Sequence, residues 1–121
     1  MRLSESEWQV MNALWEGHPA TTREVCERLP EDVIWAYTTV KTMLTRLAAK
    51  GAVGEEKKGN TSHYVPLVSR DKARRTALSR LVDMAFGGAV APMLNFLAED
   101  KELSESQRRE LIEILEKEDG S

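Results

Sequence analysis

Helix-breaking residues divide the first part of the chain into three short helical segments. Gly17 ends the first segment, Pro30 ends the second, and Gly51 stands where a helix C-terminus favours glycine. The first two segments each open with an S/T-x-x-E capping box, at Ser4 and Thr21. Residues 1–51 are therefore predicted to form three short helices in succession.

A β-hairpin is predicted to follow the third helix. Short runs that contain Val53 and Tyr64 flank the sequence KKGNT, whose Gly59-Asn60 pair favours a tight hairpin turn. Pro66 limits the second strand because proline cannot donate a ladder hydrogen bond. Three helices followed by a hairpin is the order of a winged helix-turn-helix, in which the third helix enters a DNA groove.

The rest of the chain is predicted to be helical. Ser69 is placed to cap a long fourth helix that a glycine pair ends, and a third capping box opens the last helix at Ser104. We expect a mainly α protein with two units: residues 1–68, an N-terminal winged helix-turn-helix DNA-binding domain, and residues 69–121, a small α-helical dimerisation domain.

Charge is distributed unevenly along the sequence. Residues 36–80 contain ten basic and three acidic residues, a net charge of +7, whereas residues 1–35 carry −4 and residues 81–121 carry −6. A basic middle between acidic ends indicates an anionic partner for the middle segment alone.

Several other classes of function lack support in the sequence. The single cysteine, Cys26, allows no internal disulfide and no cysteine cluster for zinc, and it suits a reducing cytoplasm. His18 and His63 lack metal-ligand spacing. No signal sequence or long apolar span is present, so we expect a cytoplasmic protein without membrane insertion. We also expect no metal and no cofactor. No nucleophile-base-acid set or phosphate loop indicates an enzyme.

The third predicted helix, residues 36–50, contains four threonines, although threonine is a poor helix former. On a helical wheel, Val40, Met43, Leu44 and Leu47 form a side suited to burial. The opposite side has short side chains at its centre and cations at its edges. From this ridge and a wing near residues 57–61, we predict DNA contacts by Thr38, Thr39, Lys41, Thr42, Thr45, Arg46, Lys50, Lys57, Lys58 and Asn60.

The chemistry of this ridge fits a DNA groove. Short side chains let a helix approach the bases of a major groove about 12 Å wide. Threonine offers a hydroxyl to bases or phosphates and a methyl group to thymine, while lysine and arginine reach phosphates. Two alternatives remain open: these residues are ordinary solvated surface, or the winged helix is an interaction module that binds protein and never DNA.

The second unit is more apolar than such short helices need for themselves. A dimer would present two winged helices to two half-sites and so roughly double the contact free energy. We predict that the dimer interface contains Leu78, Leu81, Val82, Phe86, Val90, Leu94, Leu97, Leu111, Ile114 and Leu115.

Four passages, in order, resemble the BlaI/MecI family of transcriptional repressors. SESEWQVMNALW is similar to the family's first helix, TTVKTMLTRLAAKG to its recognition helix, HYVPLVSRDKARR to its wing-to-linker passage, and FGGAVAPMLNFLAEDKELSESQRRELIEIL to its dimerisation region. The resemblance implies a homodimeric repressor on a palindromic double-stranded DNA operator. It also implies an antibiotic response in which a membrane-sensor protease pathway leads to cleavage of the repressor.

The resemblance also suggests where cleavage would occur. Antibiotic-responsive members are cut at an Asn-Phe bond, and Asn95-Phe96 stands at the matching place. The alternative is that Phe96 is a core residue of the interface. The copper-responsive branch carries a C-terminal cysteine cluster that this sequence lacks, so copper sensing is not expected. Control by a ligand, by the Cys26 thiol or by a protein partner remains open, although a lone buried thiol is usually part of a core.

Overall fold

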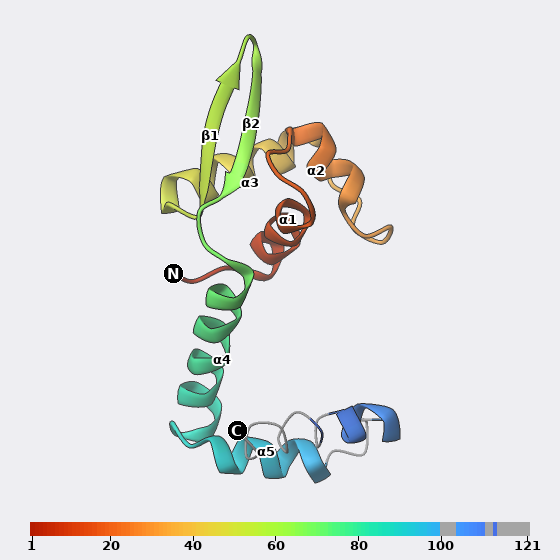
Figure 1. The fold of residues 1–121 in the computed structure, drawn as a ribbon, viewed down its shortest axis with the longest axis vertical. Helices are drawn as coiled ribbons and strands as arrows, with labels where there is room; N and C mark the ends of the chain where they lie inside the picture. Colours follow the sequence, from red (N-terminus) through yellow and green to blue (C-terminus); the bar gives the residue numbers. More distant parts are fainter. Residues whose placement is uncertain (100–103, 111–112, 114–121) are drawn as a thin grey trace. The chain divides into compact units, whose positions relative to one another are not determined.

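The structure is a computed structural model that describes residues 1–99, 104–110 and 113. Its elements, shown in Figure 1, are α1 (Glu5–Glu16), α2 (Thr22–Arg28), α3 (Tyr37–Lys50), β1 (Val53–Lys58), β2 (Thr61–Pro66), α4 (Arg70–Phe86) and α5 (Val90–Glu99). This order confirms the predicted mainly α fold with an N-terminal winged helix-turn-helix.

Local capping signals fix the helix ends where the sequence predicts them. Ser4 Oγ accepts from the Glu7 amide at 3.2 Å, and the Ser4 amide donates to Glu7 Oε1 at 2.8 Å. Thr21 and Glu24 make the same reciprocal pair at the start of α2. α3 ends at Gly51, whose φ of 84° is a left-handed conformation that glycine adopts without strain.

One hydrophobic core joins the three helices to the base of the hairpin. The predicted buried side of α3 is confirmed at Val40, Leu44 and Leu47, which are fully buried, whereas Met43 lies at the edge of the core and is only partly buried. Burial of each such side chain contributes roughly 1.5–3 kcal/mol. The other members of this core are Val10, Met11, Ala13, Leu14, Ala20, Val25, Ala52, Val53 and Tyr64.

The hairpin is antiparallel and closes through a two-residue turn. Its register runs from Val53 opposite Pro66 to Lys58 opposite Thr61, which leaves Gly59-Asn60 as the turn. Gly59, the first turn residue, has a φ of 65°. Every described residue with a positive φ is a glycine, so Asn60, the second turn residue, has a negative φ. This combination is the pattern of a type II′ turn. A bridge between Ala20 and Tyr64, with N–O distances of 3.0 and 2.8 Å, attaches the hairpin to the segment after α1.

The chain divides into two compact units, Met1–Ala77 and Leu78–Ser121. This division falls inside α4, nine residues after the predicted boundary at residue 68, and the first residue of α4, Arg70, contacts Asn12 and Trp15 of α1. Ser69 caps α4 by accepting from the Lys72 amide at 3.1 Å.

The predicted ends of the later helices also appear where the structure describes them. α4 ends before a glycine pair with positive φ, and Ser104 and Gln107 form the third capping box. Leu111, Ile114 and Leu115, predicted for the dimer interface, lie outside the described residues.

Within the described ranges, no single helix is both long and apolar enough to cross a membrane. Among these described residues, one pair of helices, α4 and α5, meets the length and composition of a span when taken together, but the pair is bent by 85° at its break.

Candidate nucleic-acid interface

All ten residues predicted to contact DNA are exposed in the structure. Those on α3 lie opposite its buried stripe, so core packing on one side of the helix presents the ridge on the other. Lys41 and Arg46 flank the threonines and form no ion pair among the residues that the structure describes. Their charges are therefore available to an anionic surface.

Two ridge threonines donate their hydroxyl hydrogens to their own helix. Thr42 Oγ1 donates to the Thr38 carbonyl at 2.9 Å, and Thr45 Oγ1 donates to the Lys41 carbonyl at 3.0 Å. These bonds satisfy the hydroxyl donors and leave the oxygen lone pairs and methyl groups for an external partner. In this geometry, the ridge can accept hydrogen bonds from base amino groups or contact thymine methyl groups.

Lys50 differs from the other cations of the ridge because it has partners inside the unit. Its Nζ lies 2.6 Å from Glu7 Oε1 and donates to the Arg2 carbonyl at 2.7 Å. Burial raises the pKa of the Glu7 carboxyl, but hydrogen bonds from Lys50 and Ser4 outweigh that effect and leave the pKa below its ordinary value. Lys50 thus holds the C-terminal turn of α3 against the start of α1.

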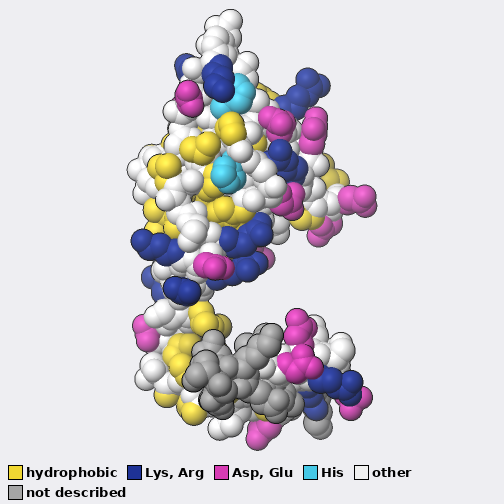
Figure 2. Space-filling model, viewed as in Figure 1, with side chains coloured by type: hydrophobic (Ala, Val, Ile, Leu, Met, Phe, Trp, Pro, Cys, Tyr) yellow, Lys and Arg dark blue, Asp and Glu magenta, His cyan; other side chains and the backbone are white. Residues whose placement is uncertain are grey.

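The wing carries its positive charge close to the turn. Lys57 and Lys58 are the last residues of β1 and pair with Ser62 and Thr61, so no acidic residue lies opposite them. The two acidic residues of β1, Glu55 and Glu56, lie nearer the base, and Glu55 accepts a hydrogen bond from the Tyr64 hydroxyl at 3.2 Å. Figure 2 shows the exposed hairpin with basic side chains near its end.

The structure adds a feature that the sequence interpretation missed, at the start of α3. Ala36 is the N-cap and makes no side-chain capping bond, in contrast to the capping boxes of α1 and α2. Uncapped amides at a helix N-terminus favour phosphate, and Tyr37 beside them is 53% exposed. An alanine at position 36, where serine, threonine or aspartate is usual, was the signal that could have revealed it.

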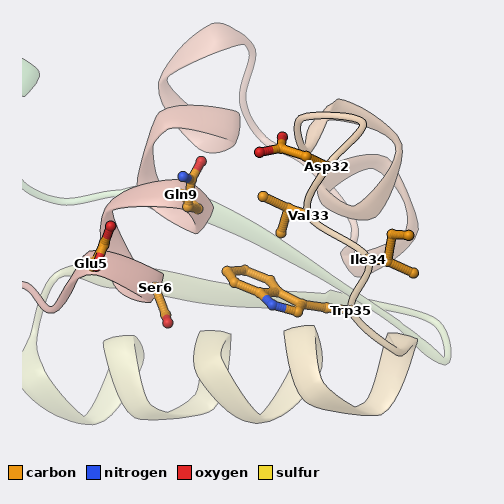
Figure 3. A pocket seen from close by; sticks show the side chains of 7 residues that line it. All are labelled: Glu5, Ser6, Gln9, Asp32, Val33, Ile34 and Trp35. Atoms are coloured by element: carbon orange, nitrogen blue, oxygen red, sulfur yellow. The ribbon is translucent and has the colours of Figure 1, made fainter.

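A shallow hollow lies beside the segment that leads into α3. It has a volume of about 400 Å³ and is lined by Glu5, Ser6, Gln9, Asp32, Val33, Ile34 and Trp35. Figure 3 shows the α1 side chains on one side of it and the side chains of residues 32–35 on the other. Among the described residues, no group of histidine, cysteine and carboxylate side chains could hold a metal ion.

Several side chains predicted for the dimer interface are exposed to solvent on the second unit. Leu78, Leu81 and Val90 are about half exposed, whereas Val82 is buried. Phe86, Leu94 and Leu97 are partly buried. Hydrophobic side chains of this unit are visible at its surface in Figure 2.

The residues at the proposed cleavage position lie in α5. Asn95 and Phe96 are both exposed, and the Phe96 ring lies 6.1 Å from the Phe86 ring. This contact attaches Phe96 to the end of α4.

Cys26 is partly buried and packs against the core. Burial raises the pKa of its thiol, so the reactive thiolate is scarce near neutral pH. This geometry gives little support to a thiol sensor.

Comparison with known proteins places these features in a family. The family model described as penicillinase repressor matches residues 3–117. The penicillinase repressor of Bacillus licheniformis is 32% identical over 116 residues, which cover 95% of this chain and 90% of that protein. The methicillin resistance regulatory protein MecI of Staphylococcus aureus strain N315 is 29% identical, with 95% and 94% covered.

Two solved structures resemble the winged-helix part. The DNA-binding domain of the repressor BlaI, in solution, aligns with a TM-score of 0.52 and 32% identity over 59% of this chain and 87% of that chain. The monomeric form of Bacillus licheniformis BlaI, in complex with the blaP half-operator, aligns with a TM-score of 0.51 and 32% identity, covering 60% and 88%.

Proposed function

The chain belongs to the penicillinase repressor family of transcriptional repressors, and on that premise we propose that it is a homodimer that binds a palindromic DNA operator. α3 would enter the major groove, and the wing would contact the backbone beside it. A repressor of this kind acts where the DNA is, in the cytoplasm.

The exposed ridge of α3 is the observation that carries the proposal. It presents Thr38, Thr42 and Thr45 between cations, on a helix whose other side is fixed in the core. A relative with the same winged helix is known in complex with a half-operator. The threonines would contact base edges, and Lys41 and Arg46 would contact phosphates.

The remaining predicted residues would contact different parts of the DNA and contribute unequally to binding. Lys57, Lys58 and Asn60 on the wing would bind phosphates or the edge of the minor groove. Thr39 would contact the backbone from the flank of α3. Lys50 would contribute less than Lys41, because Glu7 already neutralises its charge.

The second unit would supply the dimer contact. Exposed apolar side chains at Leu78, Leu81 and Val90 provide surface that a partner copy can bury. Residues 81–121 carry a net charge of −6, which would keep this unit away from the phosphates.

Relief of repression would follow from proteolysis between Asn95 and Phe96. This bond lies within α5, and a protease binds an extended segment, so α5 would have to open locally before cleavage. A cut there would divide α5, separate the residues from Phe96 onward from α4, and weaken the dimer. A membrane-sensor protease pathway would initiate the cleavage, and control by a ligand or protein partner is the alternative.

Fluorescence anisotropy on two duplexes tests the proposal. One duplex is taken from the region upstream of the protein's own gene, and the other has the same composition in scrambled order. We expect tighter binding to the native duplex, with log K falling by about 0.9 per phosphate contact against log salt. Equal, weak binding to both duplexes at physiological salt would contradict operator recognition in that region.

A further inference from the structure

We propose that Trp15 and Arg70 set the distance between the two half-sites that a dimer can read, because they fix the first turns of α4 to the winged helix. This inference rests on the proposed function and adds a positioning role for two residues outside the DNA-contacting surface.

Trp15 is the centre of the attachment. Its indole Nε1 donates to the Val68 carbonyl at 3.0 Å, across 53 residues of sequence. The ring itself is held on α1 by Trp8, whose ring centroid lies 5.8 Å away at an interplanar angle of 57°. The segment before α4 is thus bound to a side chain that α1 holds in place.

Arg70, the first residue of α4, makes two further contacts with α1. Its guanidinium lies 5.4 Å from the centroid of the Trp15 ring, a cation–π geometry. Its Nη2 also donates to the Asn12 carbonyl at 3.4 Å. A planar guanidinium can stack on the ring and donate at its edge at once, which a lysine cannot do.

Neighbouring backbone contacts support the same attachment. The Leu67 amide donates to the Ala52 carbonyl at 2.8 Å, and Val68 packs against the core. Ala73, one turn into α4, is 8% exposed. Residues 67–73 are therefore held at successive points, and the whole segment to Ala77 belongs to the winged-helix unit.

α4 is the element that the two units share. It continues from Arg70 to Phe86, and the second unit begins within it at Leu78. The contacts of its first turn restrict the direction in which α4 leaves each winged helix. In a dimer on a palindrome, that direction determines which half-site spacing both recognition helices can occupy together.

Neither residue belongs to the reading surface. Trp15 lies on α1 and Arg70 on α4, whereas the predicted base contacts lie on α3. Weakening the attachment should therefore leave the affinity for a single half-site unchanged and reduce the preference for one spacing. A residue with only a general structural role would lower both affinities together.

The test uses the full chain and its variants Arg70→Met and Trp15→Phe. The first keeps an unbranched apolar side chain without the guanidinium, and the second keeps a ring without the indole donor. Lys72→Met is the matched control, because Lys72 is an exposed cation of the same helix without an ion pair among the described residues. Each protein is titrated against a single half-site and against operators with one or two base pairs inserted or removed between half-sites.

We expect the native chain and Lys72→Met to prefer the native spacing. In Arg70→Met this preference should fall by about tenfold, the size expected for one charged hydrogen bond and one cation–π contact. In Trp15→Phe it should fall by about threefold to tenfold, because one neutral hydrogen bond to the Val68 carbonyl is lost. Half-site affinity should stay within about twofold of native, as for distant independent sites. A measured drop in half-site affinity equal to the drop on the full operator would overturn the positioning role.

The two proposals can fail separately. If the native chain discriminates between spacings and both variants retain that discrimination in full, this inference is wrong and the repressor function stands. If the native chain binds operator and scrambled duplexes alike, the proposed function fails and this inference fails with it. Circular dichroism melting of each variant verifies that it is folded at the assay temperature.

Discussion

Glu7 Oε1 and Lys50 Nζ lie 2.6 Å apart and join the first turn of α1 to the last turn of α3. The same carboxylate oxygen accepts from the Ser4 amide and so also closes the capping box of α1. One acidic side chain therefore caps one helix and anchors the end of the helix that carries the threonine ridge. The lysine is also well placed at a helix C-terminus, where the macrodipole favours a cation.

Replacing Glu7 with glutamine should destabilise the protein by about 1 kcal/mol. Glutamine can still close the capping box, so the lost stability measures the charged contact with Lys50. This contribution is modest because the lysine side chain is partly exposed to solvent. The measurement is urea unfolding followed by circular dichroism. Glu5→Gln is the matched control, since Glu5 lies in the same first turn and forms no ion pair among the described residues. An equal change in the two variants would contradict the assigned role.

Acid should remove the contribution of Glu7 to stability. The folded-state pKa of Glu7 lies below its ordinary value of 4.5, so the unfolded state binds the proton more readily. The stabilisation is complete above the unfolded pKa and is lost as pH falls through the lowered folded pKa. Urea midpoints measured from about pH 6 to about pH 3 should therefore fall more steeply for the native chain than for Glu7→Gln. If the urea midpoints of the native chain and of Glu7→Gln fall in parallel with pH, Glu7 does not cause the loss of stability in acid.

Replacing Thr42 with valine should change sequence preference more than overall affinity. Valine has nearly the same shape but lacks the oxygen that can accept from a base amino group, and it removes the bond to the Thr38 carbonyl. We expect a shift of about 1–3 kcal/mol in preference at one base pair, with an unchanged salt slope. Binding to a panel of single-base operator variants measures this. A uniform loss on every member of the panel would argue against base contact.

Replacing Lys58 with alanine should weaken binding to every DNA sequence to a similar degree. The side chain is exposed at the wing tip, next to the turn and opposite Thr61, and we propose that it contacts phosphate and no base edge of the major groove. We expect the slope of log K against log salt to fall by about 1, with no change in the ranking of sequences. Glu56→Gln, on the same strand, is the control and should not reduce the slope. An unchanged slope in Lys58→Ala would place the wing away from the backbone.

Replacing Leu81 with aspartate should convert the dimer to monomers. Leu81 is 46% exposed, so the substitution spares the interior of its own unit but would bury a charge in the proposed interface. Sedimentation velocity measures the outcome, and Ser79→Asp, an exposed neighbour on the same helix, is the control. If Leu81→Asp dimerises with the same dependence on protein concentration as the native chain, this part of α4 is not in the interface.

The exposed ridge of α3 and the exposed lysines of the wing were predicted from the sequence, whereas the contacts that hold α3 and α4 in place were not. The ridge of α3 and the lysines of the wing follow from periodicity and from the hairpin turn, which are local patterns. The uncapped start of α3 and exposed Tyr37 were not predicted, because a capping motif marks a helix start by the residues it contains and its absence leaves no comparable pattern. Met43 was assigned to the buried side because periodicity does not show where a core ends.

The sequence by itself determined the elements of this protein, and the tertiary structure decided how they are attached. The capping boxes at Ser4 and Thr21 and the glycine at Gly51 act within one helical turn, so neighbouring residues suffice to predict them. The pairing of Lys50 with Glu7 joins residues 43 apart, and the bond from Trp15 to Val68 joins residues 53 apart. Such contacts depend on how the helices pack in three dimensions, and no local pattern encodes them.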